Sequence, residues 1–372
     1  MAGAADSSTG GSTIAEPLSP TGAMFGNPAG LAGFTDRSFG QGIGFAYGVG
    51  EITATQPAGY HAENEVLVVF PEFDLVVPHG RWTFGVSSIG TSGNRFDYGA
   101  RPALGVDDGF FSESAILGLP LAAAYRVSDE LWLGVELIPL FGQNHLRFSR
   151  EVAEFPGAAT PFRYTVYGFG LQAMAGLTWR PTDRWSFGFS FRPPGRIWSE
   201  GDMKLGSGKQ DVDLELEAPA EFSLGISRRL GERWKLSYAL RFIDASVLST
   251  SYFRFEETPS ANMPFLSDAR DEWRNALGFE YEWTESLTLL GGIAAAGSIV
   301  GNKGVSPAAY DSEDLRLSTG LTWRGARWKV TSGFAYIFGG VRDIPEADAL
   351  VLPGKYDSKP AYILGFSVAR KF

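Results

Sequence analysis

Apolar side chains recur at every second position in segments spread along the whole chain. At its end, Tyr362, Leu364, Phe366 and Val368 alternate with mostly small or polar residues up to Phe372. The same spacing recurs in four further segments: Trp185, Phe187, Phe189 and Phe191; Trp234, Leu236, Tyr238, Leu240 and Phe242; Trp273, Leu277, Phe279, Tyr281 and Trp283; Trp328, Val330, Phe334, Tyr336 and Phe338. Residues two apart lie on one face of a strand. An apolar strand face with aromatic ends is typical of a transmembrane β-barrel, whose outside contacts lipid between two aromatic girdles.

The composition excludes several other classes of protein. The chain of 372 residues contains no apolar run of about 18 residues, so we expect no transmembrane helix. It contains no cysteine, which excludes disulfides and cysteine-based sites. The formal net charge of -10 is opposite to the basic surface that nucleic acid requires, so we expect no nucleic-acid partner. The three histidines show no metal-ligand spacing, and we expect no metal and no other cofactor.

The alternation predicts an all-β fold, a transmembrane antiparallel β-barrel of about fourteen strands, and bacterial single-chain barrels have even strand numbers. The predicted strands are 41–50, 65–77, 81–93, 116–128, 131–148, 168–181, 184–198, 212–230, 233–255, 272–284, 287–299, 314–324, 327–339 and 360–372. Connections of two or three residues alternate with longer links at 51–64, 94–115, 149–167, 199–211, 256–271, 300–313 and 340–359. Short turns on one side and long loops on the other are typical of outer-membrane barrels.

Charged residues stand between the apolar positions of these strands. Examples are Lys235 and Arg241 in one segment, Glu280 and Glu282 in another, and Arg316 in a third. A charge on the lipid face would cost roughly 2–4 kcal/mol at the midplane of the bilayer. We therefore expect these side chains to point into the lumen, where they can pair or be hydrated.

The first forty residues show no alternation. A Gly/Ser/Thr-rich stretch from Ser7 to Ser12 is followed by small, apolar and turn-forming residues from Ser19 to Ala32. A segment of this length without strands must be placed somewhere, and the lumen of a barrel would hold it as a plug. We predict an N-terminal hatch over 1–40 and a barrel over 41–372. The start of the sequence shows no signal peptide, and we expect the precursor to carry one.

At Asn27, Pro28 and Ala29 the sequence resembles the FadL/TodX family of outer-membrane channels for hydrophobic compounds. The motif, its position, the strand number and the terminal Phe372 carry the resemblance over the whole chain. It implies a hatch with an Asn-Pro-Ala motif that gates passage, fourteen strands, and sideways exit of the substrate through a kinked third strand. That strand holds Gly90 and Gly93, where a bulge is expected. An alternative is that these glycines begin the following loop.

The resemblance also implies a substrate pocket above the hatch and a capture site among the outer loops. The hatch candidates for substrate binding are Met24, Phe25, Leu31, Phe34 and Phe39. The loop candidates are Phe110, Phe111, Phe155 and Phe162, followed by Met263, Phe265 and Leu266. Each of these residues could instead have a purely structural role. The hatch residues could pack the hatch against the wall, and the loop residues could pack on each other.

The resulting hypothesis is a passive outer-membrane channel for small hydrophobic molecules such as long-chain fatty acids, alkanes or aromatic hydrocarbons. The alternative is a general diffusion porin for polar solutes, although the long N-terminal segment argues against it. We expect no enzyme activity, because His61, His79 and His145 are scattered and no serine motif accompanies them. Expected partners are the hydrophobic substrate, outer-membrane lipid and lipopolysaccharide, and we expect a monomer in a Gram-negative outer membrane.

Overall fold

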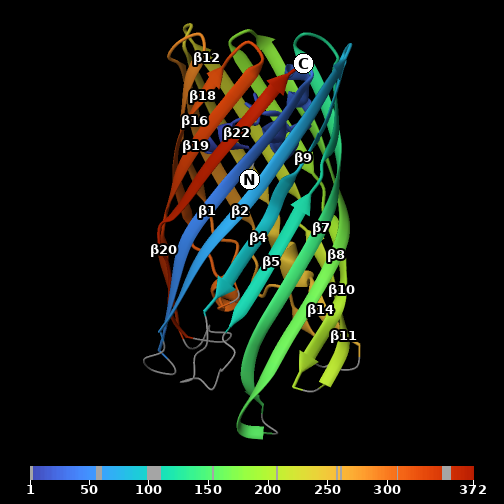
Figure 1. Ribbon diagram of the computed structural model, residues 1–372, viewed down its shortest axis with the longest axis vertical. Coiled ribbons are helices and arrows are strands. Elements are labelled where there is room, and N and C mark those ends of the chain that lie inside the picture. The colour runs from blue at the N-terminus through green and yellow to red at the C-terminus, as the bar shows by residue number, and fades with distance from the viewer. Residues whose placement is uncertain are drawn as a thin grey trace.

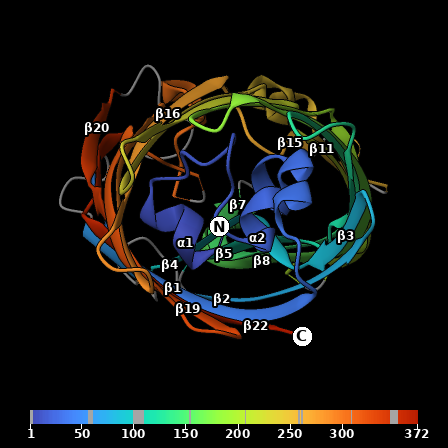
Figure 2. The ribbon, with the colours of Figure 1, turned by 90° about the horizontal axis from the view of Figure 1, so that it is seen from above.

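The computed structural model is a closed antiparallel β-barrel of 14 strands with short helices inside it (Figures 1 and 2). It describes residues 3–55, 61–98, 110–152, 155–206, 208–256, 259, 262–307, 309–345 and 353–372. The predicted fold class and strand number are confirmed. Among these residues, no helix is both long enough and apolar enough to span a bilayer.

Several wall strands are interrupted, so the barrel is made of more segments than wall strands. The N-terminal helices are α1 (Ala4–Ser8), α2 (Pro20–Gly26) and η1 (Pro28–Gly33), and the later 3-10 turns are η3 (Ala245–Thr250) and η5 (Asn302–Gly304). The strand segments are β1 (Ser38–Ala54), β2 (His61–His79), β3 (Trp82–Ser87), β4 (Ile89–Asp97), β5 (Phe111–Gly118), β6 (Leu121–Arg126), β7 (Leu131–Val152), β8 (Phe155–Thr182), β9 (Trp185–Arg192), β10 (Gly195–Leu205), β11 (Gly208–Ala218), β12 (Glu221–Leu230), β13 (Trp234–Ile243), β14 (Tyr252–Phe255), β15 (Met263–Pro264), β16 (Glu272–Glu282), β17 (Leu287–Ala296), β18 (Asp314–Arg324), β19 (Trp328–Phe338), β20 (Gly340–Ile344), β21 (Gly354–Ser358) and β22 (Ala361–Lys371).

The first and last wall strands close the sheet. β1 pairs with β2 on one side and with β21 and β22 on the other. Closure removes the sheet edge, which in lipid would leave backbone groups without hydrogen-bond partners. The tight turns, such as the one between β2 and β3, lie at the end that also holds the C-terminus, where the backbone N–H of Phe372 donates to the carbonyl of Arg37. We call this the turn end and the opposite end the loop end.

The alternation in the sequence corresponds to the two faces of the wall. The apolar set points outward, and Trp273, Leu224 and Phe169 each expose more than half of their surface. The residues between them point inward, where Ser223 and Thr178 are fully buried. The prediction that polar side chains face the lumen is therefore met on β8 and β12.

Some predicted links are strands in the structure. The predicted link over 149–167 is wrong, because β7 extends to Val152 and pairs with β8, which begins at Phe155. The predicted link over 199–211 is likewise occupied by the ends of β10 and β11. The physical reason is that lipid imposes alternation only within the bilayer, whereas backbone pairing continues beyond it.

The hatch is fixed by Asn27, which is fully buried at the junction of α2 and η1. Its side-chain Nδ2 donates to the carbonyl oxygens of Ile14 at 2.9 Å and Leu177 at 3.1 Å, and to Thr178 Oγ1 at 3.1 Å. Its Oδ1 accepts the backbone N–H of Ala29 at 3.2 Å and so caps η1. One side chain therefore joins two turns of the hatch to β8.

The neighbouring wall strand, β7, leaves room for the same motif. A side chain at Gly134 in β7 would overlap the backbone nitrogen of Ala29. The Asn-Pro-Ala motif thus lies directly on the backbone of the wall, without intervening side chains. Figure 2 shows α1 and α2 inside the ring of strands.

Buried carboxylates organise the rest of the hatch. Asp6 accepts hydrogen bonds from Thr13 Oγ1 at 2.6 Å and from the backbone N–H of Leu18 at 2.9 Å, and burial raises the pKa of its carboxyl above the ordinary value. Glu16 is also largely buried, which acts to raise its pKa, but the ammonium of Lys235, 3.0 Å away, holds that pKa below the ordinary value. Hatch and wall are therefore joined by ion pairs as well as by packing.

We predict that Asn27→Ala loosens the hatch without unfolding the barrel. The substitution leaves the buried carbonyl of Ile14 without its side-chain donor, and each orphaned group costs about 1–3 kcal/mol. The population of the open hatch should rise about tenfold or more. Planar-bilayer conductance measures this change. Asn275→Ala is the matched control, because Asn275 bonds Tyr238 on the outer face. Conductance of Asn27→Ala at the wild-type level would contradict the role assigned to Asn27.

Candidate functional site

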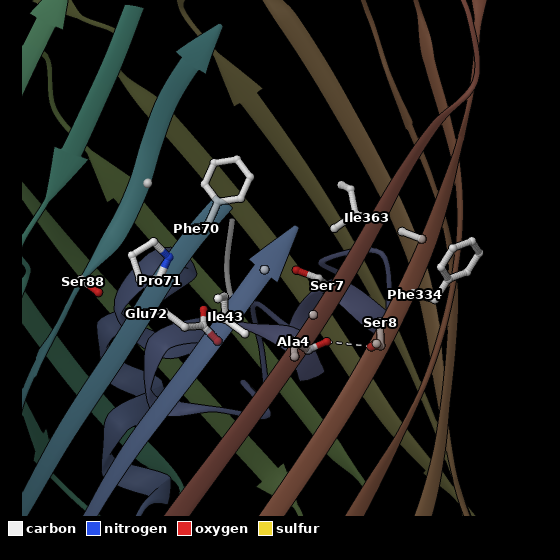
Figure 3. Close-up of a pocket in the computed structure, with 15 residues that line it drawn as sticks. Ala4, Ser7, Ser8, Ile43, Phe70, Pro71, Glu72, Ser88, Phe334 and Ile363 are labelled. Carbon is white, nitrogen blue, oxygen red and sulfur yellow. Dashed lines mark hydrogen bonds between the residues drawn. The ribbon is translucent and has the colours of Figure 1, made fainter. Parts of the chain in front are cut away.

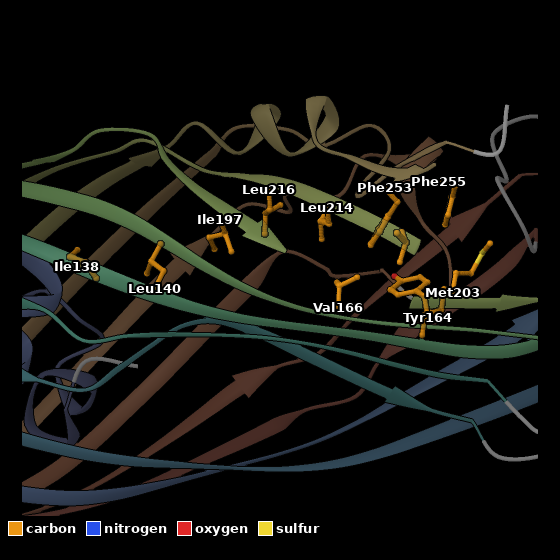
Figure 4. Packing of buried hydrophobic residues seen from close by; sticks show 12 residues of the cluster. Ile138, Leu140, Tyr164, Val166, Ile197, Met203, Leu214, Leu216, Phe253 and Phe255 are labelled. Atoms are coloured by element: carbon orange, nitrogen blue, oxygen red, sulfur yellow. The ribbon is translucent and has the colours of Figure 1, made fainter. Parts of the chain in front are cut away.

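An apolar surface lines the inside of one wall between the hatch and the loop end (Figure 4). It lies on β7, β8, β10, β11 and β14, and we call it the wall cluster. Its buried members are Ile138, Leu140, Leu146, Tyr164, Val166, Ile197, Met203, Val212, Leu214, Leu216, Phe253 and Phe255. These side chains face the interior although their neighbours in sequence, such as Leu137 and Phe141, are exposed on the outside. The wall is therefore apolar on both faces here.

A second apolar group lies towards the loop end. This mouth cluster contains Ile52, Ala62, Tyr98, Leu266, Val300, Val305, Ile344 and Tyr356. Phe110, Leu248 and Phe265 pack against both clusters. The two clusters consequently form one continuous apolar interior that extends from the loop end towards the hatch.

The backbone hydrogen bonding between neighbouring wall strands is interrupted beside the hatch. β2 pairs with β3 as far as Asp74 and Ser87, and Ser88 still exchanges hydrogen bonds with Phe73, its N–H donating at 3.1 Å and its Oγ accepting at 3.1 Å. Further towards the loop end, the side chain of Asn64 bridges the backbone of β4, accepting from Asp97 and donating to Arg95. Between these points, within the described backbone, no strand pairing joins β2 to β4.

Local sequence accounts for this interruption, which we call the β2–β4 interruption (Glu65–Glu72 of β2 and Ile89–Asn94 of β4). The register of β4 against β5 shifts between Gly90 and Ser92, as in a β-bulge. On β2, the backbone N–H of Phe73 points towards β4 and donates to Ser88. Pro71 lies two residues before Phe73, so its backbone nitrogen points towards β4 as well. A proline nitrogen has no hydrogen to donate, which removes a ladder bond towards β4.

A cavity reaches this interruption from inside the barrel (Figure 3). Its lining comes from α1, from β1, β2, β19 and β22, from Ser88 at the break between β3 and β4, and from Gly90 of β4. Phe70 and Glu72 from β2 lie on one side of it, and Ser7 and Ser8 of α1 lie on another (Figure 3).

The predicted hatch residues lie in different places. Met24 and Leu31 are fully buried and pack against Val76 and Trp132 of the wall, with Phe34 at the edge of the same group. These three residues pack the hatch against the wall, and a role for them in substrate binding stays a prediction.

Phe25 is placed differently. Its ring lies beneath two guanidinium groups, those of Arg192 at 5.8 Å and Arg241 at 5.3 Å. Arg192 also donates to the Phe25 carbonyl at 2.8 Å, and both arginines pair with Glu221. Phe25 therefore contacts a charged network of the wall.

The structure corrects the placement of Phe39. The residue belongs to β1, and its side chain is 37% exposed on the outer face together with Ile43 and Tyr47. The hatch helices end at Gly33 and β1 begins at Ser38, so the segment left for the hatch is shorter than predicted. The even positions of β1 face the lumen, and Phe39 is an odd one.

The predicted loop residues are mostly internal. Phe110, Phe162 and Phe265 pack against the wall cluster, and Leu266 belongs to the mouth cluster. Phe111 lies at the start of β5 between Arg95 and Arg147, whose guanidinium carbons are 5.2 and 5.8 Å from its ring. The side chains of Phe155 and Met263 lie outside the described residues.

The wall cluster itself was not foreseen. Leu137 to Phe141 is an apolar run with no polar position, so alternation alone does not show that Ile138 and Leu140 face inward. An apolar run within an otherwise alternating chain was the sequence feature that could have indicated an apolar inner face. Glu72, the charged residue that lines the cavity, follows the apolar run Val66 to Pro71. Alternation therefore did not show which residues of that strand face the lumen.

Comparison with known proteins identifies the family. A profile described as "Outer membrane protein transport protein (OMPP1/FadL/TodX)" matches residues 1–372. No curated protein matched the sequence. Among solved structures, a Pseudomonas aeruginosa FadL homologue is 18% identical with a TM-score of 0.85, over 100% of this chain and 98% of that one.

Two toluene transporters have the same fold. The Ralstonia pickettii transporter TbuX is 19% identical with a TM-score of 0.77, and the Pseudomonas putida transporter TodX is 17% identical with a TM-score of 0.79. Each match covers 100% of this chain and 98% of the other. Members of this family are transport channels and not enzymes. The chain belongs to the OMPP1/FadL/TodX family of outer-membrane transport proteins.

Proposed function

We propose that this protein carries small hydrophobic molecules across the outer membrane, by a route that ends at the side of the barrel. The observation that carries the proposal is the continuous apolar interior formed by the mouth and wall clusters, together with the cavity that reaches the β2–β4 interruption. A water-filled pore for polar solutes would not need an apolar inner wall. The solved relatives named as toluene transporters support the same class of substrate.

The proposed route has three stages. Phe110 and Phe265 connect the mouth cluster to the wall cluster, so an apolar solute entering at the loop end stays in contact with apolar side chains. Transfer from water into such a surface is favourable by about 25 cal/mol per Å² of buried apolar area. At the hatch, the solute passes to the cavity beside α1, and a movement of the hatch governs this step. It then leaves between β2 and β4 into the bilayer.

The surroundings of the protein follow from the same proposal. The exposed apolar band faces outer-membrane lipid, and the loop end contacts lipopolysaccharide. One closed barrel contains the whole proposed route, so a monomer is sufficient for transport. We propose this monomer as the active form.

We predict that a charge within the wall cluster blocks transport. Val166 is fully buried on β8, and Val166→Glu would place a carboxylate in contact with a passing apolar solute. Burying an unsatisfied polar group costs about 1–3 kcal/mol, so uptake of labelled toluene by cells that lack other such channels should fall about tenfold. Val166→Leu is the matched control and should keep uptake within about twofold. Equal uptake by both variants, or passage of sugars in place of toluene, would exclude the apolar route.

We also predict that filling the interruption slows exit. A side chain at Gly90 would project towards Phe70, whose Cδ1 would be 3.5 Å from the new Cβ, an ordinary contact distance. Gly90→Phe should therefore close the space between β2 and β4 without straining the backbone, and toluene uptake should fall several-fold. Gly297→Phe is the control, because Gly297 follows β17, which pairs with β16 and β18, and a new Cβ there would lie 4.0 Å from Cγ of Glu272. Native uptake by Gly90→Phe would refute exit at this place.

A further inference from the structure

The described lining of the cavity at the β2–β4 interruption contains an acidic side chain and no basic one. Its described lining contains glycine, alanine, serine, proline, isoleucine and phenylalanine, and one ionisable side chain, that of Glu72. No lysine or arginine is among those lining residues. Any molecule that reaches the interruption therefore meets a carboxyl group and, among the described lining residues, no positively charged side chain.

The position of Glu72 is fixed by the strand and by the hatch. It faces inward on β2, opposite Gly42 of β1 in the register, and a side chain at Gly42 would overlap its carboxyl. The backbone N–H of Ala4 in α1 donates to this carboxyl. The glycine and the end of α1 thus hold the carboxyl group at the cavity.

Two further carboxylates lie close to Glu72. Asp74, two residues along on the same face of β2, is buried, and its Oδ2 accepts a hydrogen bond from Thr21 Oγ1 at 3.3 Å. Asp6 of α1 is close enough to interact electrostatically with Glu72. The nearby cation, Lys329, donates to the backbone carbonyl of Leu18 in the hatch and does not line the cavity.

We propose that Glu72 is a specificity-determining residue, which makes this exit admit uncharged lipophiles and reject molecules with a carboxylate head. A carboxylate entering the cavity would lose its water and meet no positively charged side chain among the described lining residues, and such desolvation is unfavourable unless the charge is paired. As a carboxylate Glu72 repels the head group, and as an acid it offers no countercharge. An alkane, alcohol or aromatic hydrocarbon meets neither penalty. This inference rests on the proposed function and narrows its substrate class.

The test compares two solutes that share a twelve-carbon chain. Labelled dodecanol and dodecanoate are supplied at pH 7.5 to cells that lack other channels of this kind, with wild-type protein, Glu72→Gln or Glu63→Gln. Glu63 is an exposed carboxylate on the same strand, outside the interruption, and serves as the control. We expect wild type and Glu63→Gln to prefer dodecanol. Glu72→Gln should raise dodecanoate uptake about five- to tenfold with dodecanol uptake unchanged, because a charge a few ångströms away is removed from a weakly screened site.

A second variant keeps the test informative if Glu72→Gln does not fold. Ser7→Lys adds a cation to the α1 side of the cavity and leaves Glu72 in place, and it should also raise dodecanoate uptake. Folded barrel is quantified for each variant by its heat-dependent mobility on gels. Unchanged solute preference in both folded variants would overturn the role of Glu72 while leaving hydrophobic transport intact. Failure of the wild type to carry either solute would instead overturn the proposed function itself.

Discussion

The requirement that every backbone group in lipid finds a hydrogen-bond partner governs this structure. It forces the sheet to close through β1 and β22, and it fixes which side of each strand meets the bilayer. It also makes any break in the ladder expensive. The β2–β4 interruption lies beside the hatch, where Ser88 and Asn64 supply side-chain bonds at its two ends.

The hatch follows from the same closure, because a closed barrel of this size has a lumen that must be filled or left open. Small residues on the wall let the hatch backbone approach closely, and Asn27 satisfies the groups that this approach would otherwise orphan. The ion pairs of Glu16 with Lys235 and of Glu221 with Arg192 and Arg241 surround the hatch on the other side. The floor of the lumen is therefore held by specific polar contacts as well as by apolar packing, whereas the wall above it is apolar.

Sequence reasoning succeeded where lipid imposes a pattern and failed where it does not. The alternation in segments such as 185–191 and 234–242 predicted the outward faces and the number of wall strands. Beyond the bilayer the pattern ends although the pairing continues, which is why β7 and β8 proved longer than predicted. Inside the barrel, Ile138 and Leu140 were hidden in an apolar run, and Phe39 was assigned to the wrong side of the hatch boundary.

The most direct test of the account is to tie β2 to β4 across the interruption and release the tie. The chain has no cysteine, so Val68→Cys with Gly93→Cys can be joined by a short, reducible crosslinker. The matched control joins Leu75→Cys to Val86→Cys, where the two strands are already paired. The account predicts that toluene uptake falls when the first pair is linked and returns on reduction, with no change in the control. Full uptake with the first pair linked would contradict sideways exit.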